Sequence, residues 1–427
     1  MTNNKDSTFL YIEPYVHFSV SKGSILFYNT LSRKTLLYFY SISLRKKVLA
    51  LSDPQSCYTI RLTRNEFQKR EIQDFIMFLR KYYLGDIWDA TWSDSPPFNL
   101  PPYPAVKNDV PSDINSGGKV PEDFKMKYYL RELICCLNSD TSDKMNDLIH
   151  GFPQFTFPAP LSHEYNELPW EIIQQILEVD FSGESIQLTC TGSDILRYSS
   201  WDKLLQRIAQ IKIRTRLFLD YRKVTKKDLA SMLRLSQIRI ELFVTFPLLH
   251  KNMTEILKFP EKHDHMELRL VFRNEVEMKK VQEFASKARN FRISFLPYFN
   301  YKNSTFFKDI VFITMDDIKK GRPDQREILS RHSINEHDFG KFLILPDGQV
   351  HANFNDPPLG NIRNHSLKRL IIKEMQEGIS WKRTRLKVNP CKNCLYYFLC
   401  PPVSNYELFM NRFNFCKIHD GKNLDHE

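Results

Sequence analysis

The residues with the clearest chemical potential in this chain are four cysteines near its end. Cys391 and Cys394 form a C-x2-C pair, Cys400 follows after five residues, and Cys416 follows after fifteen more. Four thiolates complete either one tetrahedral zinc site or one [4Fe–4S] cluster. Zinc ribbons usually use two C-x2-C pairs. Because the second half of this set holds two separated cysteines, the spacing favours an iron–sulfur cluster, with zinc as the alternative.

The whole chain has the composition of a globular protein. Its 427 residues predict two or three domains, and 42% of them are hydrophobic. Half of the eight cysteines fall within the last 37 residues, which in a reducing compartment indicates metal ligation rather than disulfides. No apolar run reaches the roughly 20 residues of a membrane span, and the first residues open no signal peptide. We therefore expect a cytoplasmic protein without a membrane partner.

Several other kinds of chemistry lack their motifs. Only 13 residues are glycine, G-x-G-x-x-G is absent, and Gly117-Gly118-Lys119 fails the spacing of a phosphate-binding P-loop. G-x-S-x-G and H-E-x-x-H are also absent. The net charge of +11 is scattered in short runs, so it indicates a solvated surface and does not favour nucleic-acid binding.

The first part of the chain reads as a small α/β unit over residues 1–92. Two strand-like runs, 16–21 and 24–30, are joined by Lys22-Gly23, and a further pair of apolar runs follows at 36–42 and 47–51. A helical stripe over 64–83 follows Thr63, a candidate N-cap. Hairpins followed by a helix suit a winged-helix-like unit. Residues 93–128 are rich in proline and predict a linker.

Residues 129–330 alternate between strand-like and helix-like segments. The six strand-like runs are 131–138, 185–192, 214–221, 238–246, 266–274 and 291–299. The helix-like segments between them are 168–177, 201–211, 227–235, 253–259 and 275–288. Such alternation predicts parallel strands with right-handed crossovers, in an open sheet or a partial (β/α)6 barrel. Residues 331–427 differ: a hairpin at 342–350 precedes the loop-rich cysteine tail.

The cysteine tail resembles the SPASM extension of radical SAM peptide-maturing enzymes. In that family C-x2-C-x5-C and one later cysteine ligate an outer auxiliary [4Fe–4S] cluster, and Cys391, Cys394, Cys400 and Cys416 fill these positions. Runs at 346–350 and 359–362 are similar to the family's dG-V and GNI elements. The resemblance implies one [4Fe–4S] cluster on these four cysteines.

The same family pattern is incomplete elsewhere in the chain. The ligands of an inner cluster would lie at position 353, within 332–338 and at position 404, and none of these positions is a cysteine. The loop after the first strand, 139–146, lacks C-x3-C-x2-C, and Thr191-Gly192-Ser193-Asp194-Ile195 stands where G-G-E-P is expected. Without three thiolates that leave one iron open, reductive cleavage of SAM has no electron donor.

The chain therefore resembles the pseudo-radical-SAM/SPASM proteins of Bacteroidales (GG-type) ribosomal-peptide maturation systems. This resemblance implies an α/β fold: a degenerate partial (β/α)6 TIM-type barrel between an N-terminal winged-helix-like unit and a Cys-rich SPASM-like extension. It implies a pseudoenzyme that does not use SAM and acts as scaffold or electron relay. A precursor peptide, an active radical SAM maturase, or both would be its partners, and the hairpin edge of the N-terminal unit could accept the peptide as an added strand.

Two other hypotheses remain open from the sequence. One is an enzyme with non-SAM chemistry at the barrel mouth, for which Asp194 is a candidate. The other is a zinc-tailed protein that binds nucleic acid. Weaker metal-binding candidates are His263-Asp264-His265, His332 and His337, all of which we expect to be ordinary surface residues. We expect Cys190 to be buried and residues 292–301 to form a strand rather than a base-stacking surface.

Overall fold

A large parallel sheet organises the second half of the protein. The computed structural model describes residues 7–89, 126–139, 151–156, 167–178, 186–248 and 265–418. The six predicted strands are β7 (Glu132–Cys136), β8 (Gln187–Thr191), β9 (Arg214–Asp220), β10 (Ile238–Thr245), β11 (Met266–Phe272) and β12 (Arg292–Pro297). Each pairs in parallel with its neighbour in the order β12-β11-β10-β9-β8-β7. The predicted α/β class with a parallel sheet is confirmed.

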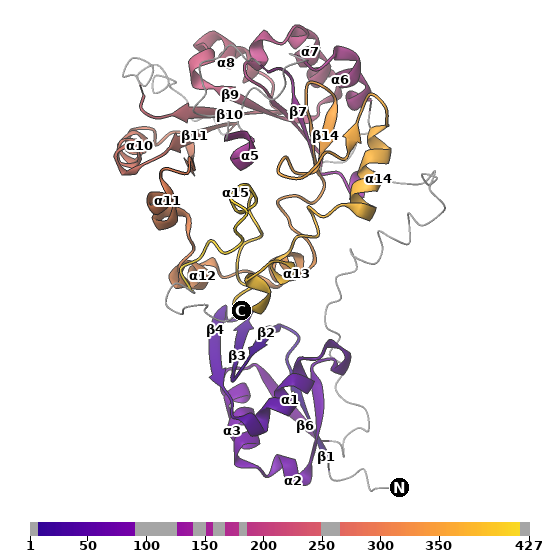
Figure 1. Ribbon diagram of the computed structural model, residues 1–427, viewed down its shortest axis with the longest axis vertical. Helices are drawn as coiled ribbons and strands as arrows, with labels where there is room; N and C mark the ends of the chain where they lie inside the picture. Colours follow the sequence, from indigo (N-terminus) through magenta and orange to yellow (C-terminus); the bar gives the residue numbers. More distant parts are fainter. Residues whose placement is uncertain are drawn as a thin grey trace.

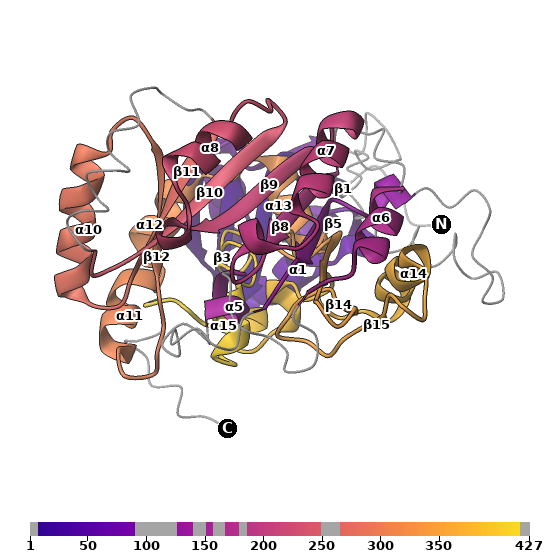
Figure 2. The same ribbon diagram turned by 90° about the horizontal axis from the view of Figure 1, so that it is seen from above.

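Helices cover the outer face of this sheet (Figures 1 and 2). They are α6 (Trp170–Leu177), α7 (Trp201–Ile211), α8 (Lys226–Met232), α10 (Glu275–Lys287) and α14 (Leu367–Glu377). Their apolar faces join the largest core cluster: Leu204 and Ile208 of α7, for example, pack with Leu217 and Leu242 of the strands. Leucine and isoleucine side chains at helical spacing form one apolar stripe that is buried only against another element.

The hairpin predicted near residue 342 extends this sheet. β13 (Lys341–Ile344) pairs in parallel with β7, and β14 (Gln349–His351) and β15 (Gly360–Asn361) follow as antiparallel strands. The sequence predicted the hairpin but not its attachment to the first strand of the sheet. Among the described residues, β12 and β15 are the two edges of the nine-stranded sheet and do not pair with each other. The sheet is therefore open.

Two short helices occupy the inner side of the curved sheet, α5 (Gly151–Phe155) and α15 (Asn405–Phe409) (Figures 1 and 2). Phe155 lies against Phe243 of β10, with ring centroids 6.4 Å apart. The buried Gln154 side chain hydrogen-bonds to the backbone after β12. Its amide donates to Phe299 O (2.9 Å) and accepts from Phe299 N (3.0 Å), as a neighbouring strand would. The inner face thus packs against the protein's own segments.

The N-terminal unit contains two three-stranded antiparallel sheets. Its elements are β1 (Ser7–Ile12), β2 (Val16–Ser21), β3 (Ser24–Asn29), β4 (Lys34–Phe39), α1 (Ile42–Ser52), β5 (Thr59–Thr63), α2 (Arg64–Phe67), α3 (Arg70–Lys81) and β6 (Gly85–Asp89). The sheets have the orders β5-β1-β6 and β2-β3-β4. The first predicted hairpin is confirmed as β2 and β3.

Two predictions for this unit are wrong. The apolar run 47–51 belongs to helix α1, because Leu44, Val48 and Leu51 recur at helical spacing and are all buried. The single helix over 64–83 is divided into α2 and α3 at Gln68 and Lys69. Thr63 does cap the start, through a capping box with Glu66. Strands β1, β5 and β6 were not predicted.

The N-terminal unit packs directly on the cysteine tail (Figure 1). Leu26 and Tyr28 of β3 form a core cluster with Ile318, Ile328, Phe398, Leu399 and Cys400. The Tyr28 hydroxyl donates to Pro323 O (2.8 Å), and Ser19 Oγ donates to Leu395 O (2.5 Å). The helices on this side are α11 (Ser304–Val311), α12 (Met315–Gly321) and α13 (Gln325–Ser333). This contact joins residues that are more than 290 positions apart, and no sequence pattern predicted it.

Some predictions fall outside the described residues: most of the linker 93–128, the loop 139–146 except its first residue, the helix at 253–259, and His263 with Asp264. Among the helices of the described part, none is long and apolar enough to cross a membrane.

Candidate metal centre

All four predicted cysteine ligands lie in one compact part of the tail. Cys391 opens the short turn η8 (Cys391–Asn393), which closes with a hydrogen bond from Cys394 N to Cys391 O (2.9 Å). Cys400 is buried, while Cys391, Cys394 and Cys416 are half-buried, and none of the four is in a disulfide. A C-x2-C pair on one tight turn brings two sulfurs to one place, as the spacing predicted.

Cys416 reaches this place from a different part of the chain. It forms an isolated parallel bridge with Ile313, just before α12. Ile313 N donates to Phe415 O and Lys417 N donates to Ile313 O, both at 2.9 Å. The backbone on both sides of Cys416 is therefore fixed by the loop between α11 and α12, although fifteen residues separate Cys416 from Cys400.

The four thiols interact electrostatically. Burial raises the pKa of Cys394 to about 11 and that of Cys400 to about 12. After burial, charges on neighbouring thiols contribute: every pair among Cys391, Cys394, Cys400 and Cys416 is close enough to raise the pKa of at least one member. The thiols are therefore grouped, and a bound metal would have to displace their protons.

The thiols of the tail do not form a ready binding site for a single ion. Among the described residues, no three His, Cys, Asp or Glu side chains are arranged to hold a single metal ion. A zinc ion with Zn–S bonds of about 2.3 Å requires sulfurs only about 3.8 Å apart. The four irons of a [4Fe–4S] cluster each take one thiolate, so that the sulfurs stand further apart than around one ion.

Arg385 connects the segments that carry the cysteines. Its side chain is 6% exposed and forms a two-pronged ion pair with Glu407, at 2.6 and 3.0 Å. It also donates to Pro401 O (2.9 Å) and Phe413 O (2.9 Å), and its Nη1 lies 3.8 Å from Cys391 Sγ. One guanidinium thus holds the turn of the first cysteine, the chain after the third and the chain before the fourth.

Arg385 could not be recognised from the sequence. A single arginine in a loop has no local pattern that distinguishes it from a surface charge. Glu407 carried a weak signal, because Ser404-x-x-Glu407 is a capping-box pattern, and the structure shows that box at the start of α15. The Arg385 guanidinium also acts to lower the pKa of Cys391, opposing the larger effect of burial, which raises it.

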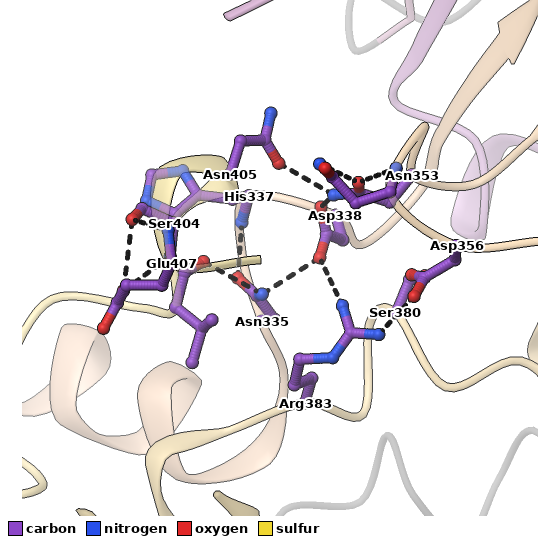
Figure 3. A network of polar contacts seen from close by, with 12 residues as sticks. Asn335, His337, Asp338, Asn353, Asp356, Ser380, Arg383, Ser404, Asn405 and Glu407 are labelled. Carbon is purple, nitrogen blue, oxygen red and sulfur yellow. Dashed lines mark hydrogen bonds and ion pairs between the residues drawn. The ribbon is translucent and has the colours of Figure 1, made fainter. Parts of the chain in front are cut away.

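A second polar cluster lies beside the centre, at the positions where the family pattern would have inner-cluster ligands (Figure 3). Asn353 Nδ2 donates to Asp338 Oδ1 (2.7 Å) and to Asn405 Oδ1 (2.8 Å). Asn335 Nδ2 donates to Asp338 Oδ2 (3.0 Å), and Arg383 lies 4.0 Å from the same carboxylate. Burial raises the pKa of Asp338 to about 6. The amide and carboxylate groups hydrogen-bond to one another, whereas Arg383 Nη1 is buried without a hydrogen bond to any described residue.

The loops at the carboxyl ends of β7 and β8 are tied together. Asn138 Nδ2 donates to Asp194 O (2.5 Å), and Asn138 Oδ1 accepts from Asp194 N (3.1 Å). A Cβ on Gly192 would lie 2.5 Å from Asn138 Oδ1, so that only glycine permits this approach. The Asp194 carboxylate pairs with Arg197 (3.3 Å). Asp194 is therefore held in place by neighbours within the fold.

The weaker candidates are structural. Cys135, Cys136 and Cys190 are buried in the sheet, and burial raises the pKa of each thiol, which is unfavourable for a nucleophile. His332 packs against Tyr397, with ring centroids 5.4 Å apart. His337 is exposed, as predicted for a surface residue. Residues 292–297 form β12, as predicted.

A cavity of about 750 Å³ lies between the C-x2-C pair and the N-terminal unit, beside their direct contact. Its walls include Ser19 and Lys22 around β2, Arg45 of α1, and Lys392 and Cys394 of the tail. β2 is an edge strand, which among the described residues pairs only with β3. Of the described residues that line the cavity, three are cationic and none is acidic.

No protein-family model matches the chain, and no curated protein is significantly similar to it in sequence. Among solved structures the chain is similar to Streptococcus suis SuiB, with 11% identity over 96% of this chain and 100% of that chain and a TM-score of 0.43. SuiB bound to the precursor peptide SuiA gives the same identity and coverage, with a TM-score of 0.42. BtrN in complex with AdoMet and 2-DOIA gives 14% identity over 62% and 92% of the two chains, with a TM-score of 0.32. At these TM-scores the similarities identify neither a family nor an activity for this chain.

Proposed function

We propose that this protein binds one [4Fe–4S] cluster through Cys391, Cys394, Cys400 and Cys416 and serves as a non-catalytic accessory protein in the maturation of a ribosomally made peptide. The observation that supports the proposal is the C-x2-C-x5-C set with a later cysteine, carried by segments of the tail that Arg385 connects through contacts to Cys391 Sγ, Pro401 O and Phe413 O. In number and softness these ligands fit a [4Fe–4S] cluster. The spacing of the four cysteines, which resembles that of the outer SPASM site, also supports one [4Fe–4S] cluster.

The cluster would supply electron storage or a local cross-link of the tail. Residues around the cysteines would stabilise such a cluster by charge and by hydrogen bonding. Arg385 places a positive charge beside Cys391, which offsets thiolate charge, and Glu407 fixes the orientation of that guanidinium. Tyr396 contributes its backbone N–H to Cys394 Sγ (3.4 Å), and such hydrogen bonds to sulfur tune cluster potentials. With four thiolates, each iron has a protein ligand and none is open to substrate.

Three features support a non-catalytic role. The loop after β7 has no cysteine, so the three-thiolate motif for SAM cleavage is missing. Phe152 and Phe155 of α5 fill part of the inner side of the sheet. The polar cluster around Asp338 and Asn353 consists of side chains that hydrogen-bond to one another, with no soft ligand for a second cluster.

We expect no reductive cleavage of SAM. Anaerobic protein incubated with SAM and dithionite should form 5′-deoxyadenosine no faster than buffer does, because no site offers an iron with an open position. The measurement is chromatography of the reaction mixture. The same reaction is run with the variant Asp194→Asn for comparison. Turnover by the wild type that the variant loses would contradict the proposal and favour an enzyme with its chemistry at the barrel mouth.

We place the peptide at the cavity between β2 and Cys394. The free edge of β2 can accept an extended peptide as an added strand, with backbone hydrogen bonds for affinity. Lys22, Arg45 and Lys392 favour a peptide that carries aspartate or glutamate, because opposite charges across an interface steer association. A peptide there would touch both the N-terminal unit and the metal-binding tail.

A fluorescent peptide that alternates glutamate with valine tests this site. We expect it to bind the full chain, and we expect the double variant Lys22→Gln/Arg45→Gln to bind it about tenfold more weakly, which corresponds to about 1.4 kcal/mol. The matched control is Lys34→Gln/Lys69→Gln, which removes two exposed cations of the same unit outside the cavity. Equal weakening by both variants, or equal binding of a lysine–valine peptide, would overturn the assignment.

A further inference from the structure

A second cavity, far from the cysteine tail in sequence, lies at the amino ends of the parallel strands. It has a volume of about 660 Å³, within the range of small-molecule sites. Gln187 and Arg214 are the first residues of β8 and β9, and Arg239 is the second residue of β10. The loops around Asp194 lie at the opposite, carboxyl ends of these strands. The cavity is therefore separate from the barrel mouth.

The lining of this cavity is cationic. Among the described residues that line it, the charged side chains are all basic: Lys212, Arg214, Arg216, Arg234 and Arg239, with His265 beside them. The Arg216 guanidinium forms ion pairs with the buried Glu241 (2.9 Å) and with Glu132 (3.6 Å), which neutralise its charge. Within the described part of the chain, Lys212, Arg234 and Arg239 have no ion-pair partner. These charges are scattered in sequence, and the crossovers of the α/β fold bring them together.

The strand register places two of these basic residues side by side. Arg216 of β9 is the direct parallel partner of Arg239 of β10, so both side chains leave the same face of the sheet at neighbouring positions. Like charges at directly paired positions on neighbouring strands are destabilising. A multivalent anion would neutralise the charge of Arg239 and Arg234, which Glu241 and Glu132 do not reach in the described structure, and arginine forks match phosphoryl oxygens in two-pronged hydrogen bonds.

We propose that this cavity binds a small anion that carries at least two phosphoryl groups. The half-enclosed shape and the volume suit a small molecule better than a nucleic-acid strand, which needs an extended groove. Among the described lining residues there is no Phe, Tyr or Trp, so the phosphoryl groups and not a stacked base would be recognised. Arg234 and Arg239 would hold the phosphoryl groups, with Lys212 as a further charge.

Titration calorimetry of the full chain with pyrophosphate at about 0.15 M salt, where screening leaves only short-range contacts strong, tests the proposal. We expect binding that weakens at least about tenfold in Arg234→Gln/Arg239→Gln. The matched control, Lys279→Gln/Lys280→Gln, removes the same charge from exposed positions on α10 and should bind like the wild type. Orthophosphate should bind at least about tenfold more weakly than pyrophosphate, because it offers one phosphoryl group.

Three results would overturn the proposal. The first is no heat of binding for pyrophosphate. The second is equal weakening by both double variants, which would mean diffuse attraction to a basic protein. The third is binding of citrate as tight as that of pyrophosphate, which would reassign the cavity to polycarboxylates. Urea unfolding of each variant without ligand separates a loss of binding from a loss of folded protein.

Discussion

Replacing Arg385 with methionine should lower the free energy of unfolding by about 3–5 kcal/mol. The change leaves the Glu407 carboxylate, which is 1% exposed, without its partner in the core of the tail. It also removes donors from Pro401 O and Phe413 O, which hold two cysteine-bearing segments together. A buried carboxylate that loses its ion pair retains the full cost of its desolvation. Urea unfolding of the full chain, followed by tryptophan fluorescence, measures the effect.

Two further variants make this test specific. Arg369→Met removes an exposed arginine of α14 and should change stability by less than about 0.5 kcal/mol. The double variant Arg385→Met/Glu407→Gln removes both charges and should be more stable than Arg385→Met alone, since no unpaired charge remains. If Arg385→Met behaved like Arg369→Met, Arg385 would not organise the tail as described.

The variant Cys394→Ala should lose most of its bound iron and sulfide. Cys394 belongs to the turn that supplies two of the four thiolates, and its removal leaves one iron without a protein ligand. The measurement is the iron and acid-labile sulfide content of protein purified without oxygen, with the visible absorption of the cluster as a second readout.

Cys57→Ala is the matched control for this loss. Cys57 is a half-buried free cysteine of the N-terminal unit and belongs to no group of thiols among the described residues. Its replacement should leave the iron content unchanged. Loss of iron from both variants would point to general damage, and retention of iron by Cys394→Ala would exclude this cysteine from the ligand set.

The parallel sheet could be predicted from sequence because its strands are short apolar runs at regular intervals, separated by amphipathic segments. Period and spacing decide such an arrangement locally. The pairing of β13 with β7 could not be predicted, because it joins residues about 200 positions apart and depends on which sheet edge is free. Helix α1 was mistaken for a strand since 47–51 is too short an apolar run to distinguish the two periods.

In the candidate metal centre, too, some residues could be predicted from the sequence and others could not. Cysteines at metal-ligand spacing are rare enough in sequence to mark the site, although no three of them are arranged in the described structure to hold a single metal ion. Arg385, Asp338 and Asn353 carry no such signal, because their roles arise from tertiary contacts. The basic cavity was hidden for a related reason: Arg216 and Arg239 are neighbours only through the register of β9 and β10.

The central claim is that the tail holds one iron–sulfur cluster. The most direct measurement is the iron, sulfide and zinc content of the full chain purified without oxygen, alongside its visible spectrum. The account predicts about four irons and four sulfides per chain, and no stoichiometric zinc. One zinc per chain without iron would contradict the cluster and return the tail to a structural zinc site. About eight irons would reveal a second cluster and reopen the question of catalysis.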